Sequence, residues 1–323
     1  MLGYIGRRMI QLVMVLIGVS IITFLIMFLI PGDPAQMLSG HNATPQRVAE
    51  VRHNLGLDRP IYEQYILFVD RLFHGNFGES YQYERPVRDM LFQAIPVTAQ
   101  LAVAAVLMEL LGIPLGVYSA LRQYTFWDTT LTTLALIIWG IPVFVVALFL
   151  QWFLGLQLSL WTGVSIFPIS GIGGKSFLLI PLDWTNLSYL ILPAISIGLV
   201  EVAYISYMQR ASMLEVIRSD FVRTARAKGL SERSVVLKHA LKNALIPVMT
   251  VAGMDLGALM GGAILTETIF NRPGVGWMVY NAIGARDLPV VAAGVLFATV
   301  AYVIANLIVD IAYAYVDPRI RYE

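Results

Sequence analysis

Six long apolar segments constrain the fold of this chain more than any other feature. Each holds about 20 or more predominantly apolar residues, the length that an α-helix needs to cross the hydrocarbon core of a bilayer. Their approximate bounds are 9–30, 97–121, 131–154, 187–208, 244–268 and 289–315. Because a segment inside lipid has to satisfy its own backbone hydrogen bonds, the pattern predicts an all-α integral membrane protein with six transmembrane helices.

The composition supports this class and excludes others. The chain is 58% hydrophobic and 13% charged, about half the charged fraction of an average soluble domain. It contains no cysteine, which excludes disulfides and thiolate metal sites. The first apolar segment is too long for the core of a signal peptide and lacks a small-x-small cleavage site, so we interpret it as a span.

The spans divide the chain into four parts. Residues 1–30 form an N-terminal segment with the first transmembrane helix, and residues 31–96 form a helical loop subdomain. Residues 97–316 form a five-helix core that contains a basic loop at 211–243, and residues 317–323 form a tail.

The segment from 31 to 96 is too long for a simple connector. Thr44 is a suitable N-cap for a helix over Pro45–Leu55. A second, amphipathic helix is expected over 61–73, because apolar residues recur there at helical spacing: Ile61, Tyr65, Phe68 and Leu72. Gly75-Asn76-Phe77-Gly78 then ends it. This subdomain either docks another protein or acts as a lid that shields the helix ends.

The distribution of basic residues predicts the orientation. Arginine and lysine concentrate beside the cytoplasmic ends of spans. The residues concerned are Arg7 and Arg8, Arg122, the cluster at 218–242, and Arg319 and Arg321. With six spans, both termini are expected in the cytoplasm and the 31–96 segment on the opposite side.

The basic loop at 211–243 has the pattern of a helix, a glycine and a second helix. Asp220 to Lys228 is expected to be helical, with Ser219 as N-cap and Gly229 just past the end. Ser231 then caps a second helix. Seven basic residues lie here: Arg218, Arg223, Arg226, Lys228, Arg233, Lys238 and Lys242. The loop is shaped to dock into another protein, and the alternative is a connection that only sets topology.

The same loop resembles the cytoplasmic coupling loop of ABC-importer permeases of the dipeptide/oligopeptide/nickel family. Arg223-Thr224-Ala225 occupies the place of Glu-Ala-Ala in the general motif, and a His-Ala-Leu run at 239–241 is followed by a delayed proline at 247. Both departures match the RTARAKG variant of this group. PGDP, LGLDRP, GNFGES and TETIFNRPGVGWMVYNAIGARDLPVV are also similar to its B-type subunits, so the resemblance covers nearly the whole chain.

The resemblance implies the type I ABC-importer permease fold and a place in a bacterial inner membrane. The chain would form half of a translocation pathway for di- or oligopeptides. Its partners would be a homologous second permease, two cytoplasmic ATPase subunits, a substrate-binding protein that contacts the outer loops, and membrane lipid, with no nucleic acid. ATP and Mg would bind to the ATPases, so this chain would hold no cofactor or metal and would not be an enzyme.

Some alternatives remain open. The same architecture could import nickel chelates, glutathione or another small solute. A stand-alone channel or secondary transporter is a remote alternative, because it would need its own coupling-ion site and would leave the basic loop unexplained. A membrane-embedded enzyme would need catalytic side chains gathered at one depth in the membrane, and the acidic residues in the spans are not accompanied by histidine or cysteine.

The resemblance also assigns the ATPase-coupling residues. These are Asp220, Phe221, Arg223, Thr224, Ala225, Arg226, Ala227, Lys228, Gly229 and Leu230. Phe221 and Leu230 would supply apolar anchors, and Ala225 and Gly229 would permit close approach. The basic side chains at 223, 226 and 228 would pair with acidic groups of the ATPase.

Polar residues inside the spans suggest the pathway. Placing a carboxylate at the bilayer centre costs about 2.5–3.5 kcal/mol, so Glu109, Glu201 and Asp255 should face a water-filled path or polar partners. The alternative is that each is a hydrogen-bonded structural carboxyl. Glu267 and Asp310 lie nearer the span ends and are expected to reach the interface.

Three glycines in the fifth span form overlapping Gly-x-x-x-Gly steps: Gly253, Gly257 and Gly261. Such steps let helix backbones approach closely. The face is therefore expected to pack against another helix, either within this chain or at the seam with a second permease.

Overall fold

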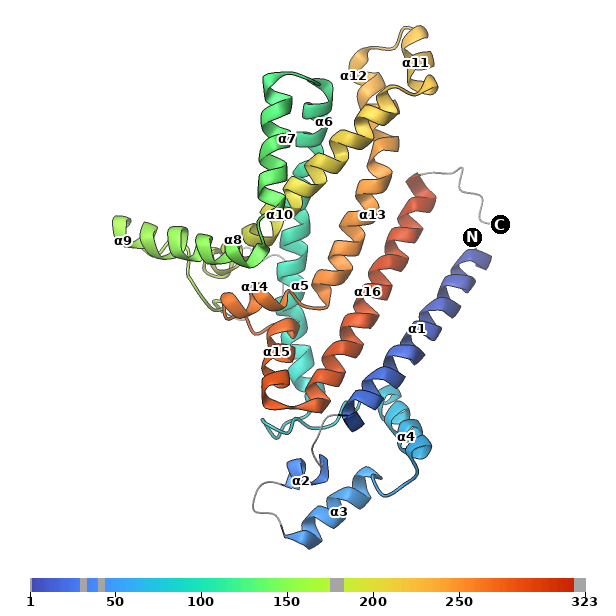
Figure 1. Ribbon diagram of the computed structural model, residues 1–323, viewed down its shortest axis with the longest axis vertical. Helices are drawn as coiled ribbons and strands as arrows, with labels where there is room; N and C mark the ends of the chain where they lie inside the picture. The colour runs from blue at the N-terminus through green and yellow to red at the C-terminus, as the bar shows by residue number, and fades with distance from the viewer. Residues whose placement is uncertain (1, 30–33, 40–43, 175–182, 317–323) are drawn as a thin grey trace. The chain divides into compact units, whose positions relative to one another are not determined.

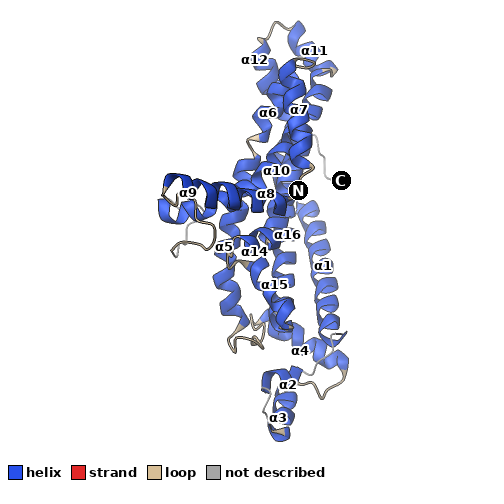
Figure 2. Cartoon of the chain, turned by 60° about the vertical axis from the view of Figure 1, so that its left-hand side comes forward, coloured by secondary structure: helices blue, strands red, loops and turns tan. Residues whose placement is uncertain are grey.

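The computed structural model describes residues 2–29, 34–39, 44–174 and 183–316. Within these ranges all regular secondary structure is helical, except for one isolated β-bridge between Glu79 and Pro86 (Figure 2). The predicted all-α class is therefore confirmed. The tail at 317–323, most of PGDP and the side chain of Asp310 lie outside the described part. The chain divides into two compact units.

The first unit comprises residues 1–95 and 278–300. It holds α1 (Leu2–Leu29), α2 (Pro34–Ser39), α3 (Pro45–Leu55), α4 (Ile61–Phe73), the start of α5 (Val87–Glu109), most of α15 (Val275–Ala285) and the first part of α16 (Leu288–Val316).

Local sequence signals specify α3 and α4, and both predicted helices are confirmed to the residue. The Thr44 hydroxyl caps α3 by accepting from the Arg47 N–H at 3.4 Å. The apolar face of α4 packs on α1, where the Phe24 ring lies 5.4 Å from Tyr65 and 5.6 Å from Phe68. A hydrogen bond of 2.9 Å between the Ser20 and Tyr65 hydroxyls supports this contact.

The second unit comprises residues 96–277 and 301–323. After the end of α5 it holds α6 (Gly112–Leu121), α7 (Phe126–Trp139), α8 (Val143–Leu150), the π-helix η1 (Gln151–Gln157), α9 (Leu158–Thr162), α10 (Trp184–Ile217), α11 (Asp220–Ala227), α12 (Glu232–Ser234), the π-helix η2 (Val235–Ala240), α13 (Leu241–Met260) and α14 (Ile264–Ile269). The central element is α10, which packs against α6, α7, α8, α13 and α14 and also contacts α11 (Figure 1).

The helices account for the six predicted spans in order. Five helical runs in the described part are long and apolar enough to cross a membrane: Val87–Leu121, Val143–Thr162, Trp184–Ile217, Glu232–Met260 and Leu288–Val309. The first predicted span corresponds to α1, which has 28 residues and an apolar stretch at Ile10–Ile26.

A proline or a glycine interrupts two of the predicted spans. The third is two helices, because α7 ends at Trp139 and α8 begins at Val143. Pro142 lacks an N–H, and its ring disfavours a helical conformation at Ile141, so the chain turns there. Figures 1 and 2 both show α8, η1 and α9 projecting sideways from α7.

The fifth predicted span stops at Met260 instead of Thr268. Gly262 has a φ of +110°, a conformation that side chains rarely adopt, and a Cβ there would clash with the backbone of Gly276. The chain therefore leaves α13 at this glycine and starts α14 at Ile264.

Candidate functional site

The basic loop forms the two-helix element that the sequence predicts. Ser219 has the extended conformation of an N-cap, although its hydroxyl donates to the Val216 carbonyl and accepts no hydrogen bond from an N–H of α11. The helix runs from Asp220 to Ala227, one residue shorter than predicted. Gly229 follows with a φ of +76°, a left-handed turn that suits glycine and sends the chain into α12.

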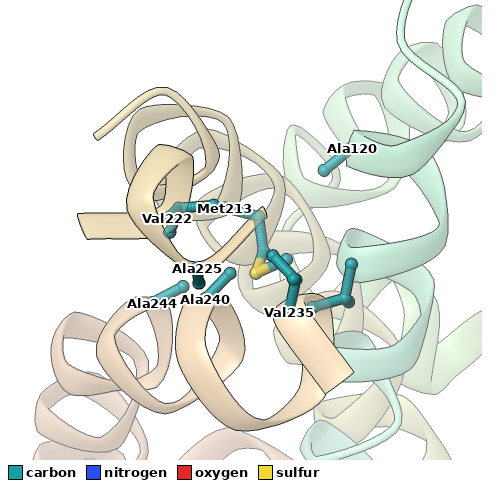
Figure 3. Close-up of a cluster of buried hydrophobic side chains, with 8 residues drawn as sticks. Ala120, Met213, Val222, Ala225, Val235, Ala240 and Ala244 are labelled. Atoms are coloured by element: carbon teal, nitrogen blue, oxygen red, sulfur yellow. The ribbon is translucent and has the colours of Figure 1, made fainter. Parts of the chain in front are cut away.

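The inner face of α11 rests on the ends of four other elements. We call the buried residues of this contact the α11 cluster: Ala120 of α6, Met213 of α10, Val222 and Ala225 of α11, Val235, Val236 and Ala240 of η2, and Ala244 of α13. Figure 3 shows the side chains of Met213, Val222 and Val235 meeting between these helices. Because buried contacts are close-packed, a displacement of α11 is passed directly to its neighbours.

Burial changes the role expected for Ala225. It is only 6% exposed, so it packs against this chain's own helices and does not offer close approach to a partner. Its small size instead lets α11 lie close to the α13 side of the cluster.

The outer surface of α11 and of the turn that follows it at 228–230 combines apolar and basic side chains. Phe221 is 45% exposed and Leu230 is 41% exposed. Asp220, Arg223, Thr224, Ala227 and Lys228 are also exposed. Exposed apolar residues surrounded by charges are typical of a protein–protein contact.

Two of the basic residues already have acidic partners within the loop. Arg226 forms a bidentate pair with Glu232, with Nη2–Oε1 at 2.7 Å and Nε–Oε2 at 3.1 Å, and this hydrogen bonding raises the pKa of Arg226 above its usual value. Arg223 lies 3.5 Å from Asp220. The Arg226 pair joins α11 to α12 across Gly229.

The structure brings together the three span acids. Glu109 ends α5, Glu201 lies in α10 and Asp255 lies in α13, and the three carboxyls are close enough to interact electrostatically. Glu109 is 1% exposed, and its Oε1 and the Oδ2 of Asp255 have no hydrogen-bond partner among the described residues. An acidic cluster with one buried member, Glu109, and two half-buried members, Glu201 and Asp255, thus lies between three helices of the second unit.

The glycine face of α13 packs within this chain. A Cβ on Gly253 would clash with Val309 of α16, and one on Gly257 would lie 2.9 Å from the Ala305 Cβ. Gly261 is the C-cap of α13. The described contacts of this face are therefore with α16.

The sequence predicts Glu267 at the membrane–water interface, but the structure buries it completely within the protein. Its Oε1 accepts from the Thr98 hydroxyl at 2.8 Å, and its Oε2 accepts from the Trp277 N–H at 2.8 Å. Gly274 makes room for this contact, because a Cβ there would lie 2.5 Å from the Thr98 Oγ1. The carboxylate therefore ties α14 to α5 and to the start of α15.

Sequence reasoning missed two further features of the second unit. Gly112 and Gly116 form a Gly-x-x-x-Gly step that seats α6 on α10, and a Cβ on Gly116 would lie 2.5 Å from the Ser206 carbonyl oxygen. This step is visible in the sequence by the rule applied to the fifth span. Asp128 and Arg210 form an ion pair, for which no local signal exists because they lie 82 residues apart.

These features define a multi-pass membrane protein with a basic two-helix element between two of its spans. The family described as "Binding-protein-dependent transport system inner membrane component" matches residues 112–322. The family described as "Binding-prot-dependent transport system membrane comp, N-term" matches residues 1–102. The chain belongs to this family and is a permease component of an ABC importer.

Curated relatives cover the whole chain. The dipeptide transport system permease protein DppB of Alkalihalophilus pseudofirmus is 40% identical over 341 residues, and the di/tripeptide transport system permease protein DppB of Pseudomonas aeruginosa is 41% identical over 336 residues. Each alignment spans 100% of both chains. A probable peptide ABC transporter permease protein of Sinorhizobium fredii is 38% identical over 99% of each chain.

A solved structure supports the fold. A chain from the structure titled "Inward facing conformations of the MetNI methionine ABC transporter: CY5 native crystal form" superposes with a TM-score of 0.55 at 16% identity. The match covers 71% of this chain and 96% of the other.

Proposed function

We propose that this chain forms one half of the translocation pathway of an ATP-driven importer of dipeptides or oligopeptides, paired with a homologous second permease. The observation that carries the proposal is the exposure of Phe221 on α11 and of Leu230 in the turn after it, while Val222 and Ala225 seat α11 on four other elements. The names of the relatives support peptides as substrate. Nickel chelates and glutathione are the alternative cargoes.

In the proposed cycle, an external binding protein delivers the substrate to the outer loops, including the 31–96 segment. Two cytoplasmic ATPase subunits bind ATP and Mg and close on one another. The outer face of α11 moves with the ATPase surface that it contacts, and the α11 cluster passes this motion to α6, α10 and α13. The spans then switch between inward- and outward-open arrangements by domain closure, and this chain supplies no catalytic group.

The acidic cluster suits the proposed substrate. Glu109, Glu201 and Asp255 place three carboxyl groups on the spans α5, α10 and α13, and carboxyls inside spans are typical of substrate or ion pathways. We infer that they face the path and attract the ammonium group of a peptide. The alternative is a set of neutral carboxyls that only stabilises helix packing.

A pair of glycine variants tests the coupling role. Gly229→Glu should abolish uptake while the protein still inserts into the membrane, because it puts an acidic side chain on the docking surface. Gly75→Glu is the matched control for folding and membrane insertion, and both variants should insert equally, because both glycines follow a helix with positive φ, +76° and +68°, and a Cβ added at either would meet no atom within 4 Å. Normal uptake by the Gly229 variant would refute the coupling assignment.

Partners and cargo are tested by purifying the tagged chain from its native host in mild detergent. Mass spectrometry should find a second permease and ATPase subunits in stoichiometric amounts, and reconstituted complex should take up labelled dipeptide. A chain that purifies alone and transports in liposomes would instead be a channel or carrier.

A further inference from the structure

A single carboxylate joins three helices beside the α11 cluster. The Asp128 side chain of α7 accepts two hydrogen bonds from Arg210 of α10, Nε–Oδ1 at 2.6 Å and Nη2–Oδ2 at 2.8 Å. The Ser119 hydroxyl of α6 donates to the same carboxylate, and so does the Tyr124 N–H at 2.9 Å. Asp128 is only 2% exposed. We call Asp128, Arg210 and Ser119 the coupling clamp.

The coupling clamp and the α11 cluster are adjacent layers on the same helices. Ser119 of the clamp precedes Ala120 of the cluster on α6, and Arg210 lies one helical turn before Met213 on α10. The helix α7 contributes no residue to the α11 cluster. Any motion of α11 therefore reaches α7 through α6 and α10, and the clamp is the charged link on that route.

We propose that the coupling clamp makes α6, α7 and α10 move as one rigid body when α11 is displaced. This deepens the proposed function and rests on it. Apolar contacts alone allow helices to slide, whereas a bidentate guanidinium–carboxylate pair fixes both distance and direction. Separating the pair would leave a buried charge without its partner, so the switching helices keep it intact. Asp128 and Arg210 are thus positioning residues for transport.

The double variant Asp128→Asn/Arg210→Gln tests this in the assembled complex in proteoliposomes. Two neutral amides keep hydrogen-bonding capacity without leaving one buried charge alone, so assembly should survive. We expect the ATP hydrolysed per dipeptide imported to rise about fivefold, within the range of coupling changes known for such networks. A purely stabilising pair would leave this ratio unchanged, and an assembled double variant with the wild-type ratio overturns the proposal.

Two further variants complete the test. Arg210→Lys keeps the charge but loses the two-point geometry, so the ATP hydrolysed per dipeptide imported should rise about twofold. This variant tests the proposal if the double variant fails to assemble. An unchanged ratio in Arg210→Lys also overturns the proposal. Asp183→Asn removes an exposed carboxylate at the other end of α10, where asparagine caps equally well, and should leave the ratio unchanged.

The Gly229→Glu variant in the same liposomes separates the two proposals. If it imports normally, the coupling role of α11 is wrong and the clamp loses its basis. If it stops import while the clamp variants keep the wild-type ratio, only the clamp proposal is wrong.

Discussion

At the scale of single residues, Asp287 illustrates how one buried carboxylate can organise a turn. It is 1% exposed and accepts hydrogen bonds from the Ser80 hydroxyl, the Tyr81 N–H at 3.1 Å and the Gln82 N–H at 3.3 Å. We expect Asp287→Ala to destabilise the protein by about 3 kcal/mol, because it removes the shared acceptor of three hydrogen bonds and leaves the buried Ser80 hydroxyl without its acceptor. Thermal unfolding in detergent measures this.

The control for that prediction is Asp70→Asn, which changes a largely exposed carboxylate on α4 and should leave the unfolding midpoint nearly unchanged. Equal midpoints for the two variants would mean that water replaces the carboxylate in the turn.

The partners of buried polar residues are what the sequence cannot predict. Asp287 and Ser80 are 207 residues apart, and Glu267 and Thr98 are 169 apart. Charge and hydropathy place such groups in or near a span, but they do not predict which distant residues form hydrogen bonds with them. For this reason the sequence predicts Glu267 at an interface, although the fold buries it.

At the scale of helices, the close contact of α6 and α10 depends on Gly116. Gly116→Ala should destabilise the protein by about 2 kcal/mol, because the new methyl group would press on the Ser206 carbonyl and the helices would have to separate. Thermal unfolding of the purified chain in detergent again provides the measurement.

Gly18→Ala is the matched control on α1. No atom lies within 4 Å of its Cβ position, so the helix preference of alanine should leave stability equal or slightly higher. A stable Gly116 variant would show that α6 and α10 can separate without loss.

Helices are predictable where local signals decide them. The bounds of α3 and α4 follow from a cap, a proline and apolar spacing within a few residues. Hydropathy is a weaker guide to span ends, because it reports lipid compatibility and not backbone conformation. Thus α10 continues to Ile217, nine residues past the predicted end at Met208, whereas Pro142 and Gly262 interrupt segments that hydropathy predicts as continuous spans.

At the scale of the whole molecule, the docking proposal requires that α11 and the 31–96 segment lie on opposite sides of the membrane. The sequence supports this through its basic residues, which flank alternate span ends. Because the chain contains no cysteine, one introduced cysteine reports the side of any chosen position. Glu50 on α3 and Arg223 on α11 are suitable positions, since their side chains are 59% and 76% exposed.

We expect an impermeant maleimide to label Glu50→Cys in right-side-out vesicles and Arg223→Cys only in inside-out vesicles. The physical reason is that the charged reagent cannot cross the hydrocarbon core, so labelling depends on which side the thiol faces. Full labelling of both variants after detergent solubilisation is the control for reactivity. If both thiols reacted from the same side, an even number of spans would separate the two positions, and α11 could not meet a cytoplasmic ATPase while the α3 region meets an external binding protein.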